Sequence, residues 1–252
     1  MFNEDLFNVH GRVACVTGAS SGLGRHCAYV LAKNGTKVVG VARNEKMLIE
    51  LKEEIGQNFE YVVSDLFQRE QNIPMIKNVC EPFGPPDILI NGAGINTREH
   101  ANDVTFENWD KTLQLNLSTP FFLSKMFVPY MIKKSWGRII NFASLQSRRA
   151  FPSGVAYGAS KGGVEQLTRA MAEAWSCNGI TVNSIAPGFF PTALTESVFK
   201  NQKLSTKNAQ QTCIGRNGRL EDLDGPLIFL SSSASDYVTG QMLFVDGGFT
   251  SK

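Results

Sequence analysis

Two side chains that could exchange a proton with a substrate, Tyr157 and Lys161, lie four positions apart in the segment YGASK. On a helix, residues with this spacing face the same side. A phenol ordinarily has a pKa of about 10, and a neighbouring ammonium group favours the phenolate form. The pair is therefore predicted to act as an acid/base near neutral pH. With five tyrosines in the chain, the spacing alone could also arise by accident.

A glycine-rich segment follows the first apolar run of the chain. Residues 17–24 read TGASSGLG, between the apolar residues 12–16 and a helical pattern that extends to Asn34. The pyrophosphate of a dinucleotide binds backbone N–H groups at a helix N-terminus, where glycines keep β-carbons out of the way. The segment predicts a dinucleotide site, with a plain tight turn as the alternative. The candidate coenzyme contacts here are Gly18, Ser20, Ser21, Gly22, Leu23 and Gly24.

The end of the second apolar run, residues 37–41, bears on which dinucleotide would bind. An enzyme that uses NAD(H) places a carboxylate here to bind the ribose hydroxyls, whereas this chain has Ala42 and Arg43. A guanidinium can pair with the 2′-phosphate of NADP(H) and stack on adenine. We therefore predict that NADP(H) is preferred. If Arg43 is solvated and Glu45 accepts from the ribose instead, NAD(H) stays open.

Polar residues also follow two later apolar runs. Asp65 and Leu66 come after the third run, where Asp65 could accept a hydrogen bond from the adenine amino group or cap the next helix. Ser144 follows the run 138–142 and should share a sheet edge with Gly18. It could hold a substrate oxygen beside Tyr157, or it could be an ordinary turn residue.

A proline interrupts the helical stretch from Phe106 to about Lys133. Pro120 has no N–H to donate to the carbonyl of Asn116, four residues earlier. A water molecule bound to that carbonyl could link Lys161 to solvent and return the catalytic proton. A simple helix kink is the other interpretation.

Apolar runs and helical patterns alternate along the whole chain. Further runs occur at residues 88–90, 138–142, 181–185 and 242–245. Alternation of this kind predicts an α/β fold with a doubly wound parallel sheet of about seven strands, whose carboxyl ends form one ligand-binding edge. We expect a single domain over residues 1–252. The polar, irregular stretch at about 189–219 is expected to form a mobile substrate flap.

Composition narrows the class of function. The 25 basic and 23 acidic residues are interspersed and leave a net charge of +2, so no nucleic-acid or membrane partner is expected. The five cysteines lie too far apart for a zinc site or a disulfide scaffold. Residues 1–12 lack the pattern of a signal peptide, and no segment is apolar enough to span a bilayer. We expect a cytoplasmic protein that acts on a small molecule and has no metal site.

Taken together, these motifs resemble the short-chain dehydrogenase/reductase family over residues 11–248. The resemblance implies a Rossmann domain, usually a homotetramer (or a homodimer), with Tyr157 as acid/base and Lys161 on the nicotinamide ribose. It also implies that Ser144 orients the carbonyl, that Asn116 holds a relay water, and that the Ile185 backbone and Thr192 bind the carboxamide of the nicotinamide. The further motif residues carried over as coenzyme contacts are Asn91, Ala93, Gly94, Pro187, Gly188 and Thr192.

One position departs from that pattern. The family often has two asparagines where this chain has Asn91-Gly92. A glycine removes a side chain that braces the sheet, so we expect some lost rigidity and unchanged chemistry.

Sequence evidence on the substrate comes from three segments, 94–98, 144–148 and 235–248, which look similar to gluconate 5-dehydrogenase-like members of the family. A sugar acid such as gluconate or 5-ketogluconate needs a cation for its carboxylate, and Arg98, Arg148 or Arg149 could supply it. Gln146 and Phe189 are further candidate substrate contacts.

Two alternatives stay open at this point. Phe151, Phe189 and Phe190 would equally suit a hydrophobic ketone or a 3-oxoacyl thioester, so a reductase of broad specificity is one of them. A dinucleotide-binding scaffold or sensor without turnover is the other. Such proteins commonly lose the tyrosine or the lysine, and this chain has both.

Overall fold

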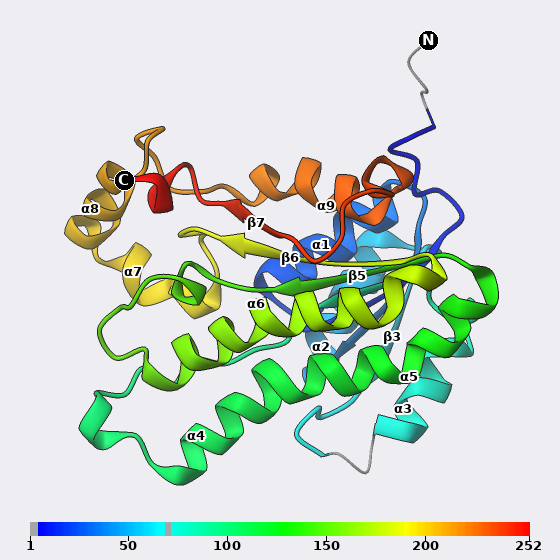
Figure 1. Cartoon of the computed structure of the whole chain (residues 1–252), viewed down its shortest axis with the longest axis horizontal. Helices are drawn as coiled ribbons and strands as arrows, with labels where there is room; N and C mark the ends of the chain where they lie inside the picture. Colours follow the sequence, from blue (N-terminus) through cyan, green and yellow to red (C-terminus); the bar gives the residue numbers. More distant parts are fainter. Residues whose placement is uncertain (1–4, 69–71) are drawn as a thin grey trace.

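The computed structural model describes residues 5–68 and 72–252. Its centre is one parallel sheet of seven strands in the order β3-β2-β1-β4-β5-β6-β7 (Figure 1). Apolar, mostly fully buried sequences form the inner strands, as expected where helices cover both faces of a sheet. The strands are β1 (Val13–Thr17), β2 (Lys37–Ala42), β3 (Phe59–Val63), β4 (Ile88–Asn91), β5 (Gly137–Phe142), β6 (Ile180–Pro187) and β7 (Met242–Val245).

Two layers of helices enclose the sheet. Cys27, Leu48 and Leu227, from α1, α2 and α9, belong to the core on one face, whereas Phe127 and Met171, from α5 and α6, belong to the core on the other. Figure 1 shows α9 and α6 on opposite sides of the strands. The helices are α1 (Gly22–Lys33), α2 (Glu45–Ile55), α3 (Asn72–Cys80), α4 (Phe106–Leu113), α5 (Thr119–Lys134), α6 (Val155–Trp175), α7 (Glu196–Lys200), α8 (Gln202–Gln211) and α9 (Asp224–Ser231).

The strand order reverses at β1, which pairs with β2 on one side and with β4 on the other. In an open parallel sheet, ligands bind at the carboxyl ends of the strands beside such a switch point. Thr17, Val41 and Asn91 lie level with one another there. The fold class and single Rossmann domain expected from the sequence are therefore confirmed. Across the described residues, no helix is both long and apolar enough to cross a membrane.

Differences from the expected elements are local. The stretch expected as one helix from Phe106 is divided into α4, a π-helical turn (Gln114–Ser118) and α5. Pro120 lies in the first turn of α5, just after the π-helical turn, and its missing N–H cannot extend an α-helical ladder. α6 extends from Val155 to Trp175 and carries both Tyr157 and Lys161, as their spacing predicted.

The stretch expected as an irregular flap contains more helix than its sequence pattern indicated. Within residues 189–219 lie a short 3₁₀ turn (Ala193–Thr195), α7 and α8. The polar composition of this stretch concealed α8, because that helix turns few side chains inward and so shows little apolar periodicity. Mobility of this segment stays a prediction.

The Thr17 side chain joins the two halves of the sheet at the switch point. Its Oγ1 atom donates to the carbonyl of Ile90 at 3.3 Å and accepts from the backbone N–H groups of Gly92 (3.1 Å) and Ala93 (3.2 Å). The residue is 2% exposed, so water does not readily replace the hydroxyl. One hydroxyl thus fixes the loop after β4 against the end of β1.

Replacing Thr17 with Val, which has the same shape and no hydroxyl, should lower the free energy of unfolding by about 1–2 kcal/mol. The Ala93 N–H group then loses its acceptor, and the Gly92 N–H group keeps only the carbonyl of Ile90. Urea unfolding followed by circular dichroism measures this change. Thr17→Ser keeps the hydroxyl and is the matched control. Equal stability of the Val and Ser variants would contradict the assigned role.

Candidate active site

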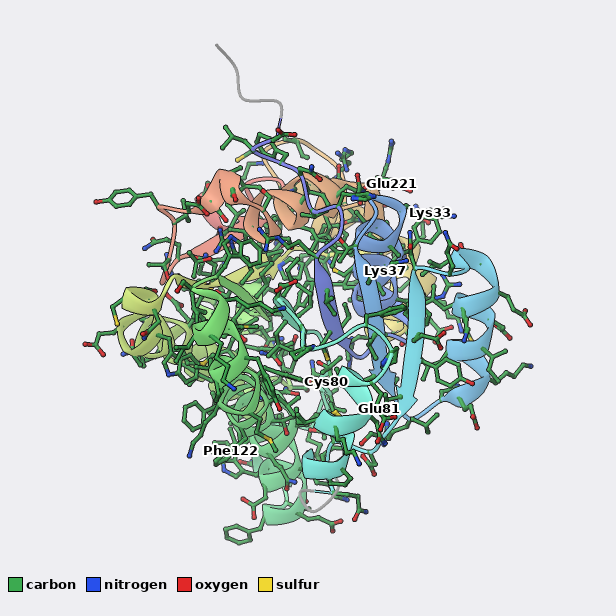
Figure 2. All side chains as sticks on the ribbon, turned by 90° about the vertical axis from the view of Figure 1, so that its right-hand side faces the viewer. Lys33, Lys37, Cys80, Glu81, Phe122 and Glu221 are labelled. Carbon is green, nitrogen blue, oxygen red and sulfur yellow. The ribbon has the colours of Figure 1, made fainter. Side chains whose placement is uncertain are left out.

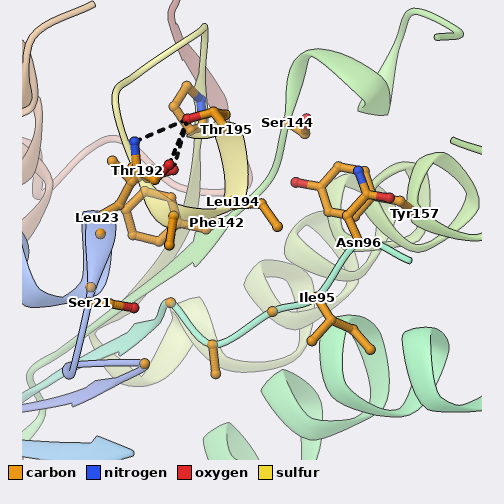
Figure 3. A pocket seen from close by; sticks show the side chains of 18 of the residues that line it. Ser21, Leu23, Ile95, Asn96, Phe142, Ser144, Tyr157, Thr192, Leu194 and Thr195 are labelled. Carbon is orange, nitrogen blue, oxygen red and sulfur yellow. Dashed lines mark hydrogen bonds between the residues drawn. The ribbon is translucent and has the colours of Figure 1, made fainter. Parts of the chain in front are cut away.

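A cavity of about 920 Å³ opens at the carboxyl edge of the sheet. Its walls come from the ends of β1 to β6 and from residues of the flap (Figure 3). Of the residues predicted as site residues, the cavity is lined by Gly18, Ser20, Ser21, Gly22, Leu23, Gly24, Arg43, Asp65, Leu66, Ala93, Gly94, Arg98, Ser144, Gln146, Tyr157, Lys161, Pro187, Gly188, Phe189 and Thr192.

The turn between β1 and α1 forms a cradle of backbone groups. Gly18 has φ +72, a left-handed conformation that favours glycine. A Cβ at Gly24 would lie 2.4 Å from the Gly18 carbonyl oxygen, so no side chain fits there without a shift of the turn. Ser21, the N-cap of α1, makes no capping hydrogen bond through its side chain. The first N–H groups of α1 therefore face the cavity as donors suited to a pyrophosphate.

The loop after β4 packs closely against this cradle. A Cβ at Gly92 would lie 2.7 Å from the Thr17 carbonyl oxygen. The expectation that Gly92 merely removes a brace is incomplete, because the glycine also permits this close approach. The brace itself comes from Asn91, whose Nδ2 donates to Asn141 Oδ1 at 2.8 Å and to Ser124 Oγ at 3.4 Å. Asn91 is buried and supports the cavity from behind.

The far end of the cavity is bounded by the segments after β2 and β3. Arg43 is exposed there, with its guanidinium carbon 6.0 Å from the centre of the Phe67 ring. Asp65 caps a local turn by accepting from the N–H of Phe67 at 3.2 Å. Glu45, the alternative ribose acceptor, is the first residue of α2 and does not line the cavity.

Tyr157 lines the same cavity from the first turn of α6. Burial raises the pKa of its phenol, while a hydrogen bond with Ser144 and the charge of Arg98 lower it. Figure 3 shows Tyr157 and Ser144 at the cavity, with Thr192 and Leu194 of the flap facing them. The structure thus brings the predicted tyrosine and serine together. The groups that lower the pKa here are Ser144 and Arg98, whereas the sequence pointed to Lys161.

The Lys161 ammonium is buried behind Tyr157. Its Nζ lies 5.6 Å from the centre of the Tyr157 ring and donates to the carbonyl of Phe142 at 2.6 Å. The residue is 5% exposed, and burial lowers its pKa to about 8. Lysine ordinarily has a pKa of about 10.4, so this group changes charge much closer to neutrality.

Asn116 lies in the π-helical turn and is buried behind the cavity. Its Oδ1 accepts from the N–H of Ile95 at 2.9 Å, and its Nδ2 donates to the Ile95 carbonyl (2.9 Å) and to Ser160 Oγ (3.0 Å). A Cβ at Gly94 would lie 3.2 Å from Asn116 Oδ1 and 3.9 Å from Lys161 Nζ. Asn116 therefore holds the loop after β4 against α6 next to the lysine.

Some predicted contacts lie elsewhere. Arg148 does not line the cavity, because its guanidinium donates to Glu165 at 2.8 Å and 3.2 Å. Arg149 donates to the carbonyl of Phe249. Ile185 does not line the cavity, and its carbonyl accepts from Ala143 N–H within the sheet, so its expected coenzyme contact stays a prediction that this geometry does not support. Of the three arginines considered for a carboxylate, Arg98 alone lines the cavity.

Several residues at the cavity carried no sequence signal of their own. Leu194, Thr195 and Asn208 lie on its walls, and all three come from the flap. Their segments lack a clear period, so no pattern indicated which side chains point inward. Thr17 lies within the glycine motif, and its position at the end of an apolar run was the one signal that could have indicated its supporting role.

The charges on the cavity wall are uneven. Arg43, Arg98 and Lys161 are cationic, and Asp65 is the carboxylate among the described lining residues. Such a wall favours anionic ligands. No group of three or more His, Cys, Asp or Glu within residues 5–68 and 72–252 could hold a metal ion.

A nucleotide cradle at a switch point, together with a tyrosine, a serine and a lysine at one sheet edge, is the arrangement of a nicotinamide-dependent oxidoreductase. The chain belongs to the short-chain dehydrogenase/reductase family, since the family model described as enoyl-(acyl carrier protein) reductase matches residues 18–250. This membership confirms the family predicted from the motifs and the assignment as an enzyme.

Relatives span the whole chain. Gluconate 5-dehydrogenase from Gluconobacter oxydans (strain 621H) is 37% identical over 253 residues, with 99% of each chain covered. A 2-dehydro-3-deoxy-D-gluconate 5-dehydrogenase from Dickeya dadantii (strain 3937) is 38% identical over 253 residues, covering 98% of this chain and 99% of the relative. The crystal structure of a gluconate 5-dehydrogenase from Burkholderia cenocepacia J2315, in complex with NADP and tartrate, has a TM-score of 0.92 and 35% identity, with 98% of both chains covered.

The depressed pKa of Lys161 predicts a pH dependence of stability. Its charged form is disfavoured in the folded chain, so this destabilisation disappears as the pH rises from the folded pKa of about 8 toward the unfolded value. Relative to Lys161→Met, the free energy of unfolding of the parent should increase by about 1–2 kcal/mol between about pH 7.5 and pH 9.5. Urea unfolding at each pH measures it.

The matched control for this measurement is Lys125→Met, at an exposed position of α5. Stability curves for the parent and Lys161→Met that stay parallel across the pH range would contradict the burial of a lysine with a pKa of about 8.

Proposed function

We propose that this protein transfers a hydride between NADP(H) and a CH–OH or ketone carbon of a sugar acid such as gluconate or 5-ketogluconate. The observation that carries the proposal is the cationic cavity wall, with Arg43 at the coenzyme end and Arg98 beside Tyr157. The relatives named above act on gluconate or on a related keto sugar acid by their names, which supports this substrate class.

The cavity fits the coenzyme at several points. The left-handed Gly18, the space that Gly24 leaves against the turn, and the uncapped N-terminus of α1 would hold the pyrophosphate. Arg43 would pair with the 2′-phosphate, which supports NADP(H) over NAD(H). The relative from Burkholderia cenocepacia was crystallised with NADP.

When bound, the nicotinamide supplies or accepts the hydride. In the direction of reduction, Tyr157 would donate its proton to the substrate oxygen, which Ser144 would hold by a hydrogen bond. Lys161, fixed by the Phe142 carbonyl, would bind the nicotinamide ribose and favour the phenolate that remains. Arg98, whose charge already lowers the Tyr157 pKa, would bind the substrate carboxylate. Asn116 would hold the water that returns a proton to Lys161.

A second candidate activity is reduction of a 3-oxoacyl thioester. The apolar side of the cavity favours it, since Phe151 and Phe189 both line the cavity with ring centres 6.1 Å apart. The matching family model, whose description names a reductase acting on an acyl carrier protein, points the same way.

We further propose a cytoplasmic homotetramer, as the family resemblance implies. Exposed apolar side chains on three helices support it: Phe106 of α4 is 92% exposed, Phe122 of α5 46% and Val155 of α6 47%. Figure 2 shows Phe122 directed outward from α5. Burial of such side chains between copies would stabilise the assembly.

Substrate class is tested with purified protein, NADP⁺ or NADPH, and a panel of D-gluconate, 5-ketogluconate and an acetoacetyl thioester. Turnover of the sugar acids is expected, and turnover of the thioester alone would refute their assignment.

Tyr157→Phe should lower kcat at least about a hundredfold while NADPH binding is retained, because only the proton donor is removed. Retained turnover in that variant would exclude Tyr157 as the acid.

Coenzyme choice is tested at Arg43. Arg43→Ala should weaken NADPH binding by about tenfold or more and NADH binding much less, because only NADPH carries the 2′-phosphate. Fluorescence titration of both coenzymes measures the two effects. Lys46→Ala, on the exposed side of the adjacent helix, is the control. Equal losses for both coenzymes would show that Arg43 does not contact the phosphate.

A further inference from the structure

α8 places a buried amide on the wall of the cavity. Asn208 is 6% exposed and lines the cavity together with Val198 of α7 and Leu204 of α8. Its Nδ2 atom is buried, and no acceptor for it exists in the part of the chain that the structure describes. This amide belongs to no motif of the sequence and has no part in the catalytic steps above.

An orphaned donor of this kind is unfavourable, because the amide has left water and gained no replacement hydrogen bond. Native proteins satisfy nearly all buried polar groups, so an exception calls for a physical reason. A ligand that brings an oxygen atom to the cavity wall would supply the acceptor. The two apolar neighbours, Val198 and Leu204, cannot do so.

Arg98, also on the cavity wall, contacts the flap just before α8: its Nη1 donates to Ser197 Oγ of α7 at 2.9 Å, and its Nη2 donates to the carbonyl of Leu194. The same guanidinium is close enough to Tyr157 for its charge to lower the pKa of the phenol. α7 and α8 pack against each other, so the helix that carries Asn208 adjoins the helix that Arg98 contacts. The adenosine end, at Arg43, belongs to the segments after β2 and β3.

We propose that Asn208 is a substrate-recognition residue whose Nδ2 donates a hydrogen bond to a hydroxyl oxygen of a polyhydroxy acid, away from the carbon that is oxidised or reduced. The inference rests on the proposed function and specifies it further. Arg98 accounts for the carboxylate of such a substrate, and Asn208 accounts for its hydroxyl chain. An acyl thioester, which has an alkyl chain in the same position, offers Nδ2 no acceptor.

Two variants test the proposal in the full chain. Asn208→Leu keeps the approximate size and removes both hydrogen-bonding groups. It should raise KM for the turned-over sugar acid about tenfold, change kcat less than about threefold, and leave NADPH affinity unchanged. Asn208→Asp removes the Nδ2 donor and adds a negative charge to the wall that binds an anionic substrate, so its KM should rise at least as much as that of Asn208→Leu. Gln211→Leu, at an exposed position of the same helix, is the matched control.

Thermal unfolding separates recognition from a structural role. Asn208→Leu removes an unsatisfied amide, so its unfolding temperature with NADPH should equal or exceed that of the parent. A lower unfolding temperature, or a KM within about twofold of the parent value, would overturn the inference while sugar-acid turnover by the parent keeps the proposed function intact. A smaller loss in Asn208→Asp than in Asn208→Leu would overturn the assignment of Nδ2 as the donor. A parent without activity on any sugar acid would overturn both proposals.

Discussion

The parallel direction of all seven strands is the constraint on which the rest of this structure depends. Parallel neighbours cannot be joined by tight turns, so each connection crosses a face of the sheet as a helix and returns to the same edge. Every strand then ends on one side of the molecule. Residues as distant in sequence as Thr17, Asn91 and Ser144 meet there because each follows or ends a strand at this edge. The cavity is a consequence of that arrangement.

Polar groups behind the cavity hold it in shape. Thr17 joins β1 to the loop after β4, Asn91 joins β4 to β5 through Asn141, and Asn116 joins the same loop to α6. Each of these side chains is buried and bonded to two or more partners. Bonds of this kind are costly to break in a low-dielectric interior. They give the groups that face the cavity a rigid support.

The sequence predicted the structure best where the local conformation depends on neighbouring residues alone. The glycine turn after β1 needs a left-handed Gly18 and a close approach at Gly24, so the motif itself encodes the geometry. Continuous apolar runs indicate buried strands, and their order along the chain predicted the sheet. The placement of Tyr157 and Lys161 on one helix face followed from their spacing.

The features of the site that the sequence did not predict depend on contacts between distant segments. Arg148 and Arg98 are alike in sequence terms, and Glu165, seventeen positions away, decides that Arg148 is held outside the cavity. Arg98 instead reaches the flap, 99 positions further along, through Ser197. The inward direction of Asn208 likewise depends on how α8 packs. Periodicity in a short polar helix carries too little information to predict such packing.

The nucleotide cradle has a consequence for how this chain can change over evolutionary time. The cradle is suited to a diphosphate because main-chain atoms face it and Gly18 and Gly24 carry no side chains. The proposed preference for one coenzyme depends instead on the exposed Arg43, which follows a different strand. Affinity and selectivity are therefore carried by separate parts of the molecule. A few surface mutations could therefore change the coenzyme preference between NADP(H) and NAD(H) during evolution, without disturbing the glycine turn.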